Sequence, residues 1–469
     1  MSSNMQALPE LPLQHGTFDF IGCELNDGSA FLRYQLRYQH NGASVCVDMT
    51  ETVRFPGAPA LSSMTPARAA AAKRALTLLH VMAGTSYYKA LLPPNLMTHE
   101  NLSPALAKLA KAVYTQGLAE FGYQNKLTLA PQFTSGATGP AASALSLSPR
   151  ALVAIGGGKD SLVSVEALKR AGTPACAVWI GRSELIAATA KASGLPTLNI
   201  SRDIAPELFT LNAQGALNGH VPVTAINSAI LVLAAILYDY NQVIFSNERS
   251  ASAATLIHEG QPVNHQWSKG ADFENALRQL VRTEIALDLH YFSLLRPFSE
   301  LAVTQKFAAV DTYDALFSSC NRNFRILGDK PASRWCGQCP KCHFVFLALA
   351  PFVAKPRLLK IFGKNLLDEI ELAPTFAALL EWNGAHKPFE CVGEAGESRA
   401  AFFQLLERAD WREDALVQHF ARHIARNIEK PDLAALLKPD ADALSQLPIN
   451  LQKALAGIDL KDSNSAKTC

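Results

Sequence analysis

The stretch "ALVAIGGGKDS", residues 151–161, constrains the fold of this chain more than any other segment. Five apolar residues come first, three glycines follow, and a lysine, an aspartate and a serine end it. The apolar run predicts a buried strand, and the glycines predict a tight turn into a helix. Such a strand, turn and helix are typical of phosphate-binding loops. The type of phosphate ligand and reaction has to be inferred from the other residues of the chain.

Strands and helices alternate after this loop. Apolar strands are indicated at 151–155, 174–181, 196–200 and 242–248, and helices at 160–172, 183–194 and 224–240. Continuous apolar strands that alternate with helices are typical of a parallel sheet that is covered on both faces. We therefore predict an α/β fold built on a parallel sheet.

The flanking segments have different patterns. Residues 17–56 alternate as strands do around a hairpin turn, whereas 65–123 is helical, with Thr65 and Ser103 as expected N-caps before prolines. A stretch rich in Gly, Ser, Ala and Pro precedes the loop and indicates a linker. We predict five segments: an antiparallel β unit at 1–60, a helical unit at 61–132, a linker at 133–149, a catalytic domain around the loop at 150–350 and a mainly helical region at 351–469.

The bulk properties exclude several classes. Lys and Arg number 43 against 41 Asp and Glu, so we expect no general attraction to nucleic acid or to anionic membranes. The longest apolar run, 229–238, is about half of what a bilayer needs, and it predicts a buried helix rather than membrane insertion. The start of the chain lacks a signal-peptide pattern, so we expect a reducing cytoplasm. There the nine cysteines would serve metal binding, catalysis or packing instead of disulfides.

Three phosphate-loop motifs compete for the turn. A Walker A loop needs Ser or Thr where Asp160 follows Lys159, and the dinucleotide fingerprint needs glycine where Ser161 lies. The pyrophosphatase loop, S-G-G-x-D-S, is matched at five of six positions, with Gly156 in place of the first serine. The segment thus resembles the ATP-pyrophosphatase (PP-loop) superfamily, and an ordinary glycine-rich turn is the alternative.

The resemblance implies an ATP-binding domain that cleaves ATP between its α and β phosphates and passes AMP to a substrate oxygen. Glycines let backbone N–H groups approach phosphate oxygens, and the helix N-terminus adds a favourable dipole. The Ser161 hydroxyl would donate to a phosphate, and Asp160 would help to hold Mg²⁺. The implied nucleotide-binding residues are Gly156, Gly157, Gly158, Lys159, Asp160 and Ser161.

Two further polar clusters follow the loop. "FSNERSAS" comes directly after a predicted strand, where ligands bind in open α/β sheets, and "VNHQWSK" follows it. Glu248 and His265 are candidate proton-transfer groups, and Arg249 and Lys269 would neutralise a phosphate or carboxylate. The predicted substrate-binding residues of the first cluster are Ser246, Asn247 and Arg249.

Four cysteines form a third cluster. Cys320 is followed, after fifteen residues, by "CGQCPKC", which contains Cys336, Cys339 and Cys342. Four thiols with this spacing favour a structural zinc site. An iron–sulfur cluster and a compact loop of reduced thiols are the alternatives.

Several stretches carry a narrower resemblance: "GGGKDS", "SNERSAS", "VNHQWSK", "YFSLLRPFSELAV", "RWCGQCPKCHFVFLALAPF" and "KPFECVG". Their order and spacing over roughly 150–395 resemble the UDP-N-acetylmuramoyl-L-alanyl-L-glutamate epimerase family (MurL). The resemblance implies an isomerase that uses ATP and Mg²⁺ to invert the terminal L-glutamate of UDP-MurNAc-L-Ala-L-Glu for peptidoglycan synthesis. The expected partner is this small nucleotide-sugar peptide.

Epimerisation without an organic cofactor often uses two bases, one on each face, and thiols serve well. Cys391 in "KPFECVG" is therefore a candidate base, and the predicted catalytic residues are Glu248, His265, Lys269 and Cys391. Two other functions remain open at this point. One is a different adenylating enzyme, acting on a deazapurine carboxylate or a tRNA base. The other is an ATP-binding sensor without catalysis.

Overall fold

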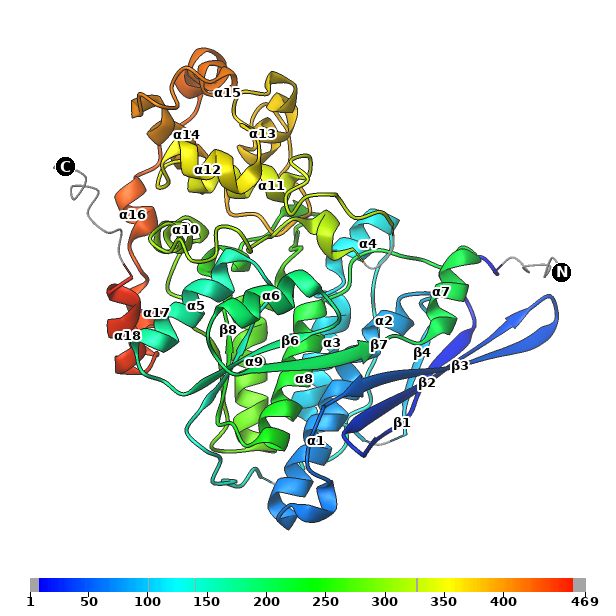
Figure 1. Cartoon of the computed structure of the whole chain (residues 1–469). Coiled ribbons are helices and arrows are strands. Elements are labelled where there is room, and N and C mark those ends of the chain that lie inside the picture. Colours follow the sequence, from blue (N-terminus) through cyan, green and yellow to red (C-terminus); the bar gives the residue numbers. More distant parts are fainter. Residues whose placement is uncertain (1–7, 100, 140, 326–327, 459–469) are drawn as a thin grey trace.

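The computed structural model describes residues 8–99, 101–139, 141–325 and 328–458. One nine-stranded sheet forms its centre, in the order β11-β8-β5-β6-β7-β3-β2-β1-β4 (Figure 1). Its strands are β1 Gly16–Asn26, β2 Ser29–His40, β3 Ala43–Arg54, β4 Asn95–Thr98, β5 Ala151–Ala154, β6 Ala175–Ile180, β7 Thr197–Asp203, β8 Gln242–Phe245 and β11 His290–Ser293. A small hairpin, β9 Leu256–His258 and β10 Gln261–Val263, forms a second sheet.

The predicted parallel sheet is confirmed. The strands β11, β8, β5, β6 and β7 are parallel neighbours. Alternate strand residues point into two cores: Leu152 and Val243 belong to one, and Val153 and Ile244 to the other. Helices therefore cover both faces, as continuous apolar strands require.

The first core is closed by α1 Pro66–Ala83, α2 Thr85–Tyr88, α3 Pro104–Thr115, α4 Ala119–Asn125, α7 Pro206–Ala213, α8 Val223–Tyr238 and α9 Ala271–Leu280. The Thr65 and Ser103 hydroxyls accept hydrogen bonds from backbone N–H groups in the first turns of α1 and α3, so both predicted N-caps are confirmed. The apolar run at 229–238 is the buried part of α8, also as predicted. Within the described residues, no helix has both the length and the apolar character to cross a bilayer.

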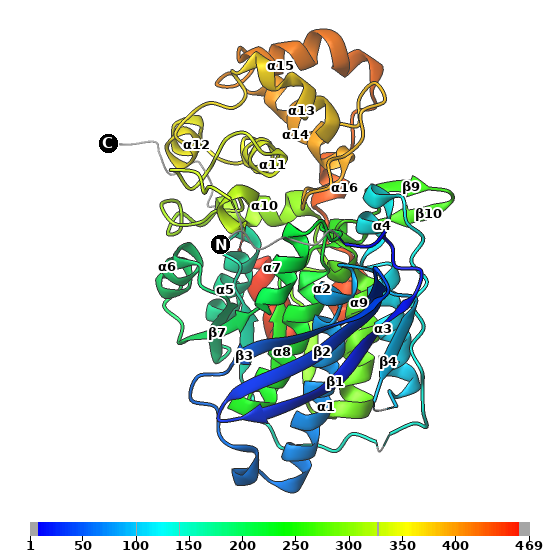
Figure 2. The ribbon, with the colours of Figure 1, turned by 90° about the vertical axis from the view of Figure 1, so that its right-hand side faces the viewer.

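The second core is closed by α5 Lys159–Arg170, α6 Glu184–Ala192 and α10 Glu300–Ala308, and by helices of the C-terminal region. These are α11 Pro340–Leu349, α12 Lys355–Phe362, α13 Ala373–Leu379, α14 Ala395–Glu407, α15 Ala415–His419, α16 Leu433–Leu437, α17 Ala441–Ser445 and α18 Ile449–Ala456. Figures 1 and 2 show α11–α15 as a helical lobe on the far side of α10 from the sheet. The chain then returns along α5, where the Arg170 guanidinium donates to the Gly457 carbonyl at 2.7 Å.

The N-terminal strands differ from the expectation of a small sheet of their own. The hairpin of β1 and β2 is confirmed, with Asp27 and Gly28 at positive φ in its turn. However, β3 pairs with β7 in antiparallel orientation, with Thr52–Arg54 opposite Ser201–Asp203, and this pairing joins the N-terminal strands to the parallel strands in one sheet. Alternation of apolar and polar residues indicates a half-buried strand, but it does not indicate which strand pairs with it. The sequence therefore could not reveal the pairing of β3 with β7.

A buried ion pair secures the junction. Glu51 of β3 is fully buried and accepts two hydrogen bonds from the Arg202 guanidinium of β7, at 2.7 and 2.9 Å. The Tyr87 hydroxyl donates to the same carboxylate at 2.8 Å. We expect Glu51→Ala to cost about 3 kcal/mol, the lower end for a buried pair, because it leaves the mostly buried Arg202 guanidinium without its partner. Thermal unfolding should show a clearly lower midpoint.

Glu24 provides the matched control. It pairs with Arg33 across β1 and β2, where both side chains are exposed, so Glu24→Ala should cost about 0–1 kcal/mol. Equal midpoints for the two variants would show that the pair between β3 and β7 does not secure the junction.

The described residues of the predicted linker, 133–139 and 141–149, form no helix or regular strand but are held in place. The Asp288 carboxylate accepts hydrogen bonds from the backbone N–H groups of Leu145 and Leu147 at 2.8 and 3.1 Å. The Ala142 N–H donates to the Thr283 carbonyl at 2.9 Å. The segment is therefore fixed along the body of the protein, and the domain limits stay a prediction.

The strand order places a crevice beside β5. The chain passes from β5 to β6 and β7 on one side, then crosses to β8 on the other side of β5. Neighbouring strands whose connections leave in opposite directions open a crevice at their carboxyl ends, where ligands bind in such sheets. The two segments that leave this crevice are 155–158 after β5 and 246–248 after β8.

Candidate active site

The phosphate loop connects β5 to α5 at the crevice. Gly157 has φ of +80°, a conformation that favours glycine, and Gly158 is the N-cap of α5. A Cβ atom at residue 158 would lie 2.7 Å from the Ser319 hydroxyl oxygen, so that position has room only for glycine unless Ser319 moves. The predicted strand, turn and helix are thus confirmed, and the helix N-terminus faces the crevice with the dipole that suits an anion.

Three carboxylates gather under the loop. Asp160 of α5, Glu248 after β8 and Glu300 of α10 bring their oxygens within 4.8 Å of one another. Lys159 is fully buried and lies between two of them, in an ion pair with Asp160 and 2.9 Å from Glu300. Lys341 approaches Glu300 at 3.5 Å.

The carboxylates differ in their affinity for protons. Burial alone raises the pKa of Glu300, but Lys159 and Lys341 outweigh it and lower the value to about 2. For Glu248, burial and the charges of Glu300 and Asp160 raise the pKa to about 8. Glu248 is therefore the carboxyl whose negative charge the lysines compensate least. Three clustered carboxyl groups, of which those of Glu248 and Glu300 are buried, fit a hard divalent cation such as Mg²⁺, which would take the place of the Glu248 proton.

A thiol, an imidazole and an ammonium group form a second cluster. The Lys269 ammonium donates to the Cys391 sulfur at 3.2 Å, and the His265 ring is hydrogen-bonded to the same sulfur. Burial alone raises the pKa of Cys391, but Lys269 and His265 lower it to about 5. Burial alone lowers the pKa of His265, but hydrogen bonds to Cys391 and Glu120 raise it to about 9. At neutral pH the pair is therefore a thiolate beside an imidazolium.

Glu120 of α4 holds this pair in place. Its carboxylate is hydrogen-bonded to Nδ1 of His265 and lies 3.4 Å from Nδ1 of His220. The two imidazole rings lie 4.7 Å apart, and burial with the charge of His265 lowers the pKa of His220 to about 3. His220 is thus neutral when His265 is charged.

Lys269 links the two clusters. Burial alone lowers its pKa, but the negative charges of Cys391, Glu248 and Asp160 raise it above its ordinary value. A cavity of about 970 Å³ opens over the thiolate and is lined by His220, His265 and Lys269 among others. Two further cations lie on its walls. Lys89 is buried, which lowers its pKa to about 8, and Arg202 is mostly buried in its ion pair with Glu51. The site therefore offers a nucleophilic or basic thiolate in a positively charged cavity.

The remaining predicted residues are arranged as follows. The Ser161 hydroxyl donates to the Gly158 carbonyl at 3.1 Å, and the Ser246 hydroxyl donates to Ser164 at 2.7 Å. The Asn247 amide donates to the Ser293 hydroxyl at 3.0 Å. Arg249 is the residue that the structure does not bring to the others, because it lines a separate cavity of about 410 Å³. Its role in substrate binding stays a prediction.

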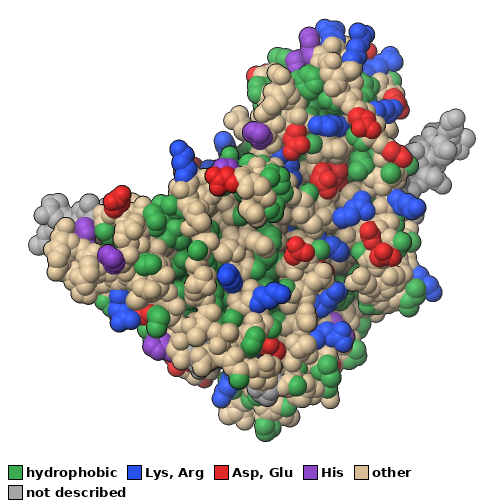
Figure 3. All heavy atoms as spheres, turned by 180° about the vertical axis from the view of Figure 1, so that it is seen from behind, with side chains coloured by type: hydrophobic (Ala, Val, Ile, Leu, Met, Phe, Trp, Pro, Cys, Tyr) green, Lys and Arg blue, Asp and Glu red, His purple; other side chains and the backbone are tan. Residues whose placement is uncertain are grey.

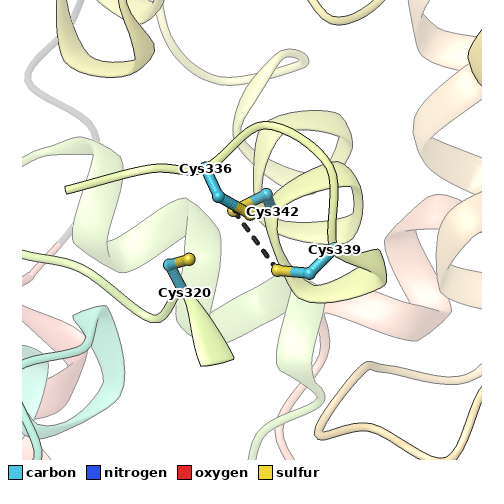
Figure 4. A group of neighbouring side chains, drawn as sticks. All are labelled: Cys320, Cys336, Cys339 and Cys342. Atoms are coloured by element: carbon cyan, nitrogen blue, oxygen red, sulfur yellow. Dashed lines mark hydrogen bonds between the residues drawn. The ribbon is translucent and has the colours of Figure 1, made fainter. Parts of the chain in front are cut away.

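The four clustered cysteines do come together (Figure 4). The Cys342 sulfur lies 3.7 Å from that of Cys336 and 3.4 Å from that of Cys339. The sulfur of Cys320 completes a group in which all four atoms lie within 4.8 Å of one another.

Sequence reasoning missed several residues of the site: Glu120, His220, Arg296, Glu300 and Lys341. Arg296 fixes both clusters, because its guanidinium donates to the Glu248 carbonyl at 2.7 Å and to the Lys269 carbonyl at 2.5 Å. Three of the five had a usable signal: Arg296 and Glu300 lie in "YFSLLRPFSELAV" and Lys341 lies in "RWCGQCPKCHFVFLALAPF", and both stretches were singled out for their resemblance. Glu120 and His220 lie outside any motif that would mark them as chemical groups.

Comparisons with known proteins identify the family of this chain. Two family models match the chain: the MurL N-terminal domain over residues 10–294 and the MurL C-terminal domain over residues 316–434. The chain is 53% identical over 426 residues to a UDP-N-acetyl-alpha-D-muramoyl-L-alanyl-L-glutamate epimerase of Xanthomonas oryzae pv. oryzae, with 90% of this chain and 92% of that protein covered. It is 44% identical to proteins of the same name from Salinispora tropica and a Micromonospora species, over 86% of this chain and 87% and 89% of theirs.

The two family models together cover the phosphate loop, the cysteine cluster and most of the two cores. The identities hold over nearly the whole length of each relative, so the match is not confined to a shared nucleotide-binding loop. The chain therefore belongs to the MurL family and is an enzyme, an isomerase of the epimerase type.

Proposed function

We propose that this enzyme inverts the terminal L-glutamate of UDP-MurNAc-L-Ala-L-Glu to D-glutamate, with cleavage of ATP to AMP and pyrophosphate. The curated relatives carry the name of this epimerase and support the substrate. The observation that carries the proposal is the thiolate of Cys391, held by His265 and Lys269 beside a carboxylate cluster under a phosphate loop. The cluster of Cys391, His265 and Lys269 suits proton abstraction, and the carboxylate cluster suits a metal-bound nucleotide.

Activation of the substrate explains why such an enzyme would use ATP. A proton next to a carboxylate is very hard to remove, because its loss places a second negative charge on the same small group. Transfer of AMP to that carboxylate, with release of pyrophosphate, removes the first charge and makes the carbonyl a better electron sink. After a base has removed the Cα proton, a proton returns to Cα from the opposite face, which inverts the centre. Water then cleaves the acyl-adenylate and releases AMP and the substrate with a terminal D-glutamate.

The phosphate loop and the carboxylates would serve the adenylation. Backbone N–H groups at 156–158 and the N-terminus of α5 would bind the phosphates that leave as pyrophosphate. Asp160, Glu248 and Glu300 would hold Mg²⁺, which would neutralise charge on the nucleotide. This assignment uses Glu248 as a ligand rather than as the base, because two other carboxylates surround it.

Cys391 would remove the Cα proton on one face. Its thiolate is already formed at neutral pH, because Lys269 and the imidazolium of His265 stabilise it. Glu120 in turn is hydrogen-bonded to Nδ1 of His265. The cations Lys89 and Arg202 on the cavity wall suit the diphosphate of the nucleotide sugar. A cavity of about 970 Å³ is at the upper end of small-molecule sites, in line with a substrate of this size.

The pH dependence of kcat/KM should be bell-shaped. The thiolate of Cys391 is lost as pH falls through about 5, and the imidazolium of His265 is lost as pH rises through about 9. The rate should therefore pass through a maximum between these values and fall on both sides, with loss of the Lys89 charge near pH 8 contributing to the basic limb. In His265→Gln the part of the basic limb near pH 9 should disappear. A rate that rises steadily to pH 10 would contradict a preformed ion pair.

The function is tested by one incubation with UDP-MurNAc-L-Ala-L-Glu, ATP and Mg²⁺. Chiral analysis of the hydrolysed product should show D-glutamate, and nucleotide analysis should show AMP rather than ADP. Omission of ATP should stop both. Inversion without ATP would support the epimerase activity and contradict the adenylation step. No inversion would contradict the proposed substrate.

A further inference from the structure

The four-cysteine group has the dimensions of a single metal site. In a tetrahedral zinc site with Zn–S bonds of about 2.3 Å, the sulfurs lie about 3.8 Å apart. The measured separations of 3.7 and 3.4 Å agree, and all four sulfurs lie within 4.8 Å of one another. Figure 4 shows the four side chains directed toward a common centre. A cluster of several irons needs more room between its thiolates.

The local backbone favours thiolates at these positions. Gly337, with φ of +62°, lets the chain fold tightly between Cys336 and Cys339. The Gln338 N–H donates to the Cys336 sulfur at 3.4 Å. Cys339 is the N-cap of α11 and Cys342 lies in its first turn, where the helix dipole stabilises negative charge.

The same segments hold two parts of the active site. Lys341, between two of the cysteines, donates its backbone N–H to Glu390 at 2.7 Å and directs its ammonium toward Glu300. Asn321, next to Cys320, is hydrogen-bonded to Glu390 from the other side and lines the large cavity. Glu390 directly precedes the proposed base, Cys391.

The cysteine group also reaches the phosphate loop. Two residues before Cys320, the Ser318 N–H donates to the Gly157 carbonyl at 2.9 Å. Ser319 packs against Gly158 so closely that a Cβ atom there would touch its hydroxyl. The Ser318 hydroxyl in turn donates to the Arg334 carbonyl at 2.6 Å, near the second cysteine segment.

We propose that Cys320, Cys336, Cys339 and Cys342 bind one Zn²⁺, and that this ion holds the phosphate loop and the Glu390–Cys391 segment in their relative positions. The ion has a structural role, because four protein ligands leave no open position for substrate. The proposal concerns residues of this chain and does not depend on the reaction that it catalyses. Loss of the ion would free 318–325 and 336–342 from each other and loosen both parts of the active site.

Metal content tests the binding site. Elemental analysis of protein purified without chelator should find about one zinc per chain, and Cys342→Ser should lose most of it. Cys46→Ser is the matched control, because Cys46 is exposed on β3 and should leave the zinc unchanged. Iron in place of zinc, or a metal-free protein with four reactive or disulfide-bonded cysteines here, would overturn the proposal.

Hydrogen exchange tests the positioning role without relying on turnover. Wild-type protein stripped of zinc by a chelator avoids the risk that the serine variant does not fold. Amides of 156–161 and 318–325 should then exchange at least about tenfold faster, while those of β1 and β2 should not change. Zinc added back should restore protection. If amide hydrogen exchange in the zinc-stripped protein equals that of the zinc-bound protein, the ion does not position the two segments, and only the metal-binding part of the proposal stands.

Discussion

Cys391→Ser should abolish exchange of the substrate Cα proton while ATP-dependent formation of AMP continues. Serine fits the same space, but its hydroxyl has a far higher pKa and stays protonated beside Lys269 and His265. Loss of a base in this position lowers a rate by about 10²–10⁴-fold. Adenylation uses the phosphate loop and the carboxylates, which the substitution does not touch, so AMP should still form from the L-glutamate substrate.

The two readouts are measured in the same reaction, one by chromatography of nucleotides and the other by isotope exchange at Cα. Cys46→Ser again serves as the control and should behave like wild type in both. Exchange at the wild-type rate in Cys391→Ser would exclude the thiolate as the base. Parallel loss of AMP and exchange would indicate that the thiolate acts before or during adenylation.

Asp160→Asn should stop AMP formation and therefore also the Cα proton exchange and the inversion that follow adenylation. The amide keeps the shape of the side chain but removes one of the three negative charges, and it frees Lys159 from one partner. Loss of a ligand charge from the proposed Mg²⁺ site should reduce the rate about 10²–10³-fold and raise the Mg²⁺ concentration needed for half-maximal rate. The measurement is pyrophosphate release as a function of Mg²⁺.

Glu166→Gln is the control on the same helix. Glu166 pairs with Lys169 and accepts a hydrogen bond from the Tyr313 hydroxyl at 2.6 Å, away from the loop. It should leave pyrophosphate release unchanged. If Asp160→Asn releases pyrophosphate at the wild-type rate and with the same Mg²⁺ dependence, the carboxylate cluster does not hold the nucleotide metal.

The elements that the sequence predicted are those whose signals are local. The strand β5, the glycine turn and the helix α5 follow from eleven consecutive residues, and the caps Thr65 and Ser103 follow from a hydroxyl before a proline. Such signals act within one or two turns of the chain. The junction of β3 with β7 needs a pairing across about 150 residues, and no local pattern encodes it.

The candidate site shows the same limit. Glu248, His265 and Lys269 were recognised because polar side chains are dense in two short segments, and Cys391 because its stretch resembled a known family. That Lys269 and Cys391 touch across 122 residues emerges only from the fold. Glu120 and His220 each appear in the sequence as single polar residues, and only the folded chain shows that they support His265.

The burial that sets the pKa values could not be predicted from composition. Cys391 is acidic because Lys269 and His265 are held beside it in a partly desolvated position. The prediction of a thiol base, which stays a prediction, named the group but not its charge state. The structure adds the ion pair, and with it the expected pH limits of the reaction.

One incubation in D₂O with ATP, Mg²⁺ and UDP-MurNAc-L-Ala-L-Glu tests the central claim most directly. AMP, pyrophosphate and deuterium at the glutamate Cα are followed together. Adenylation followed by proton removal predicts a product with D-glutamate, deuterium at Cα and AMP formed in step with it. AMP without deuterium would contradict the epimerisation, and deuterated D-glutamate without AMP would contradict the activation by ATP.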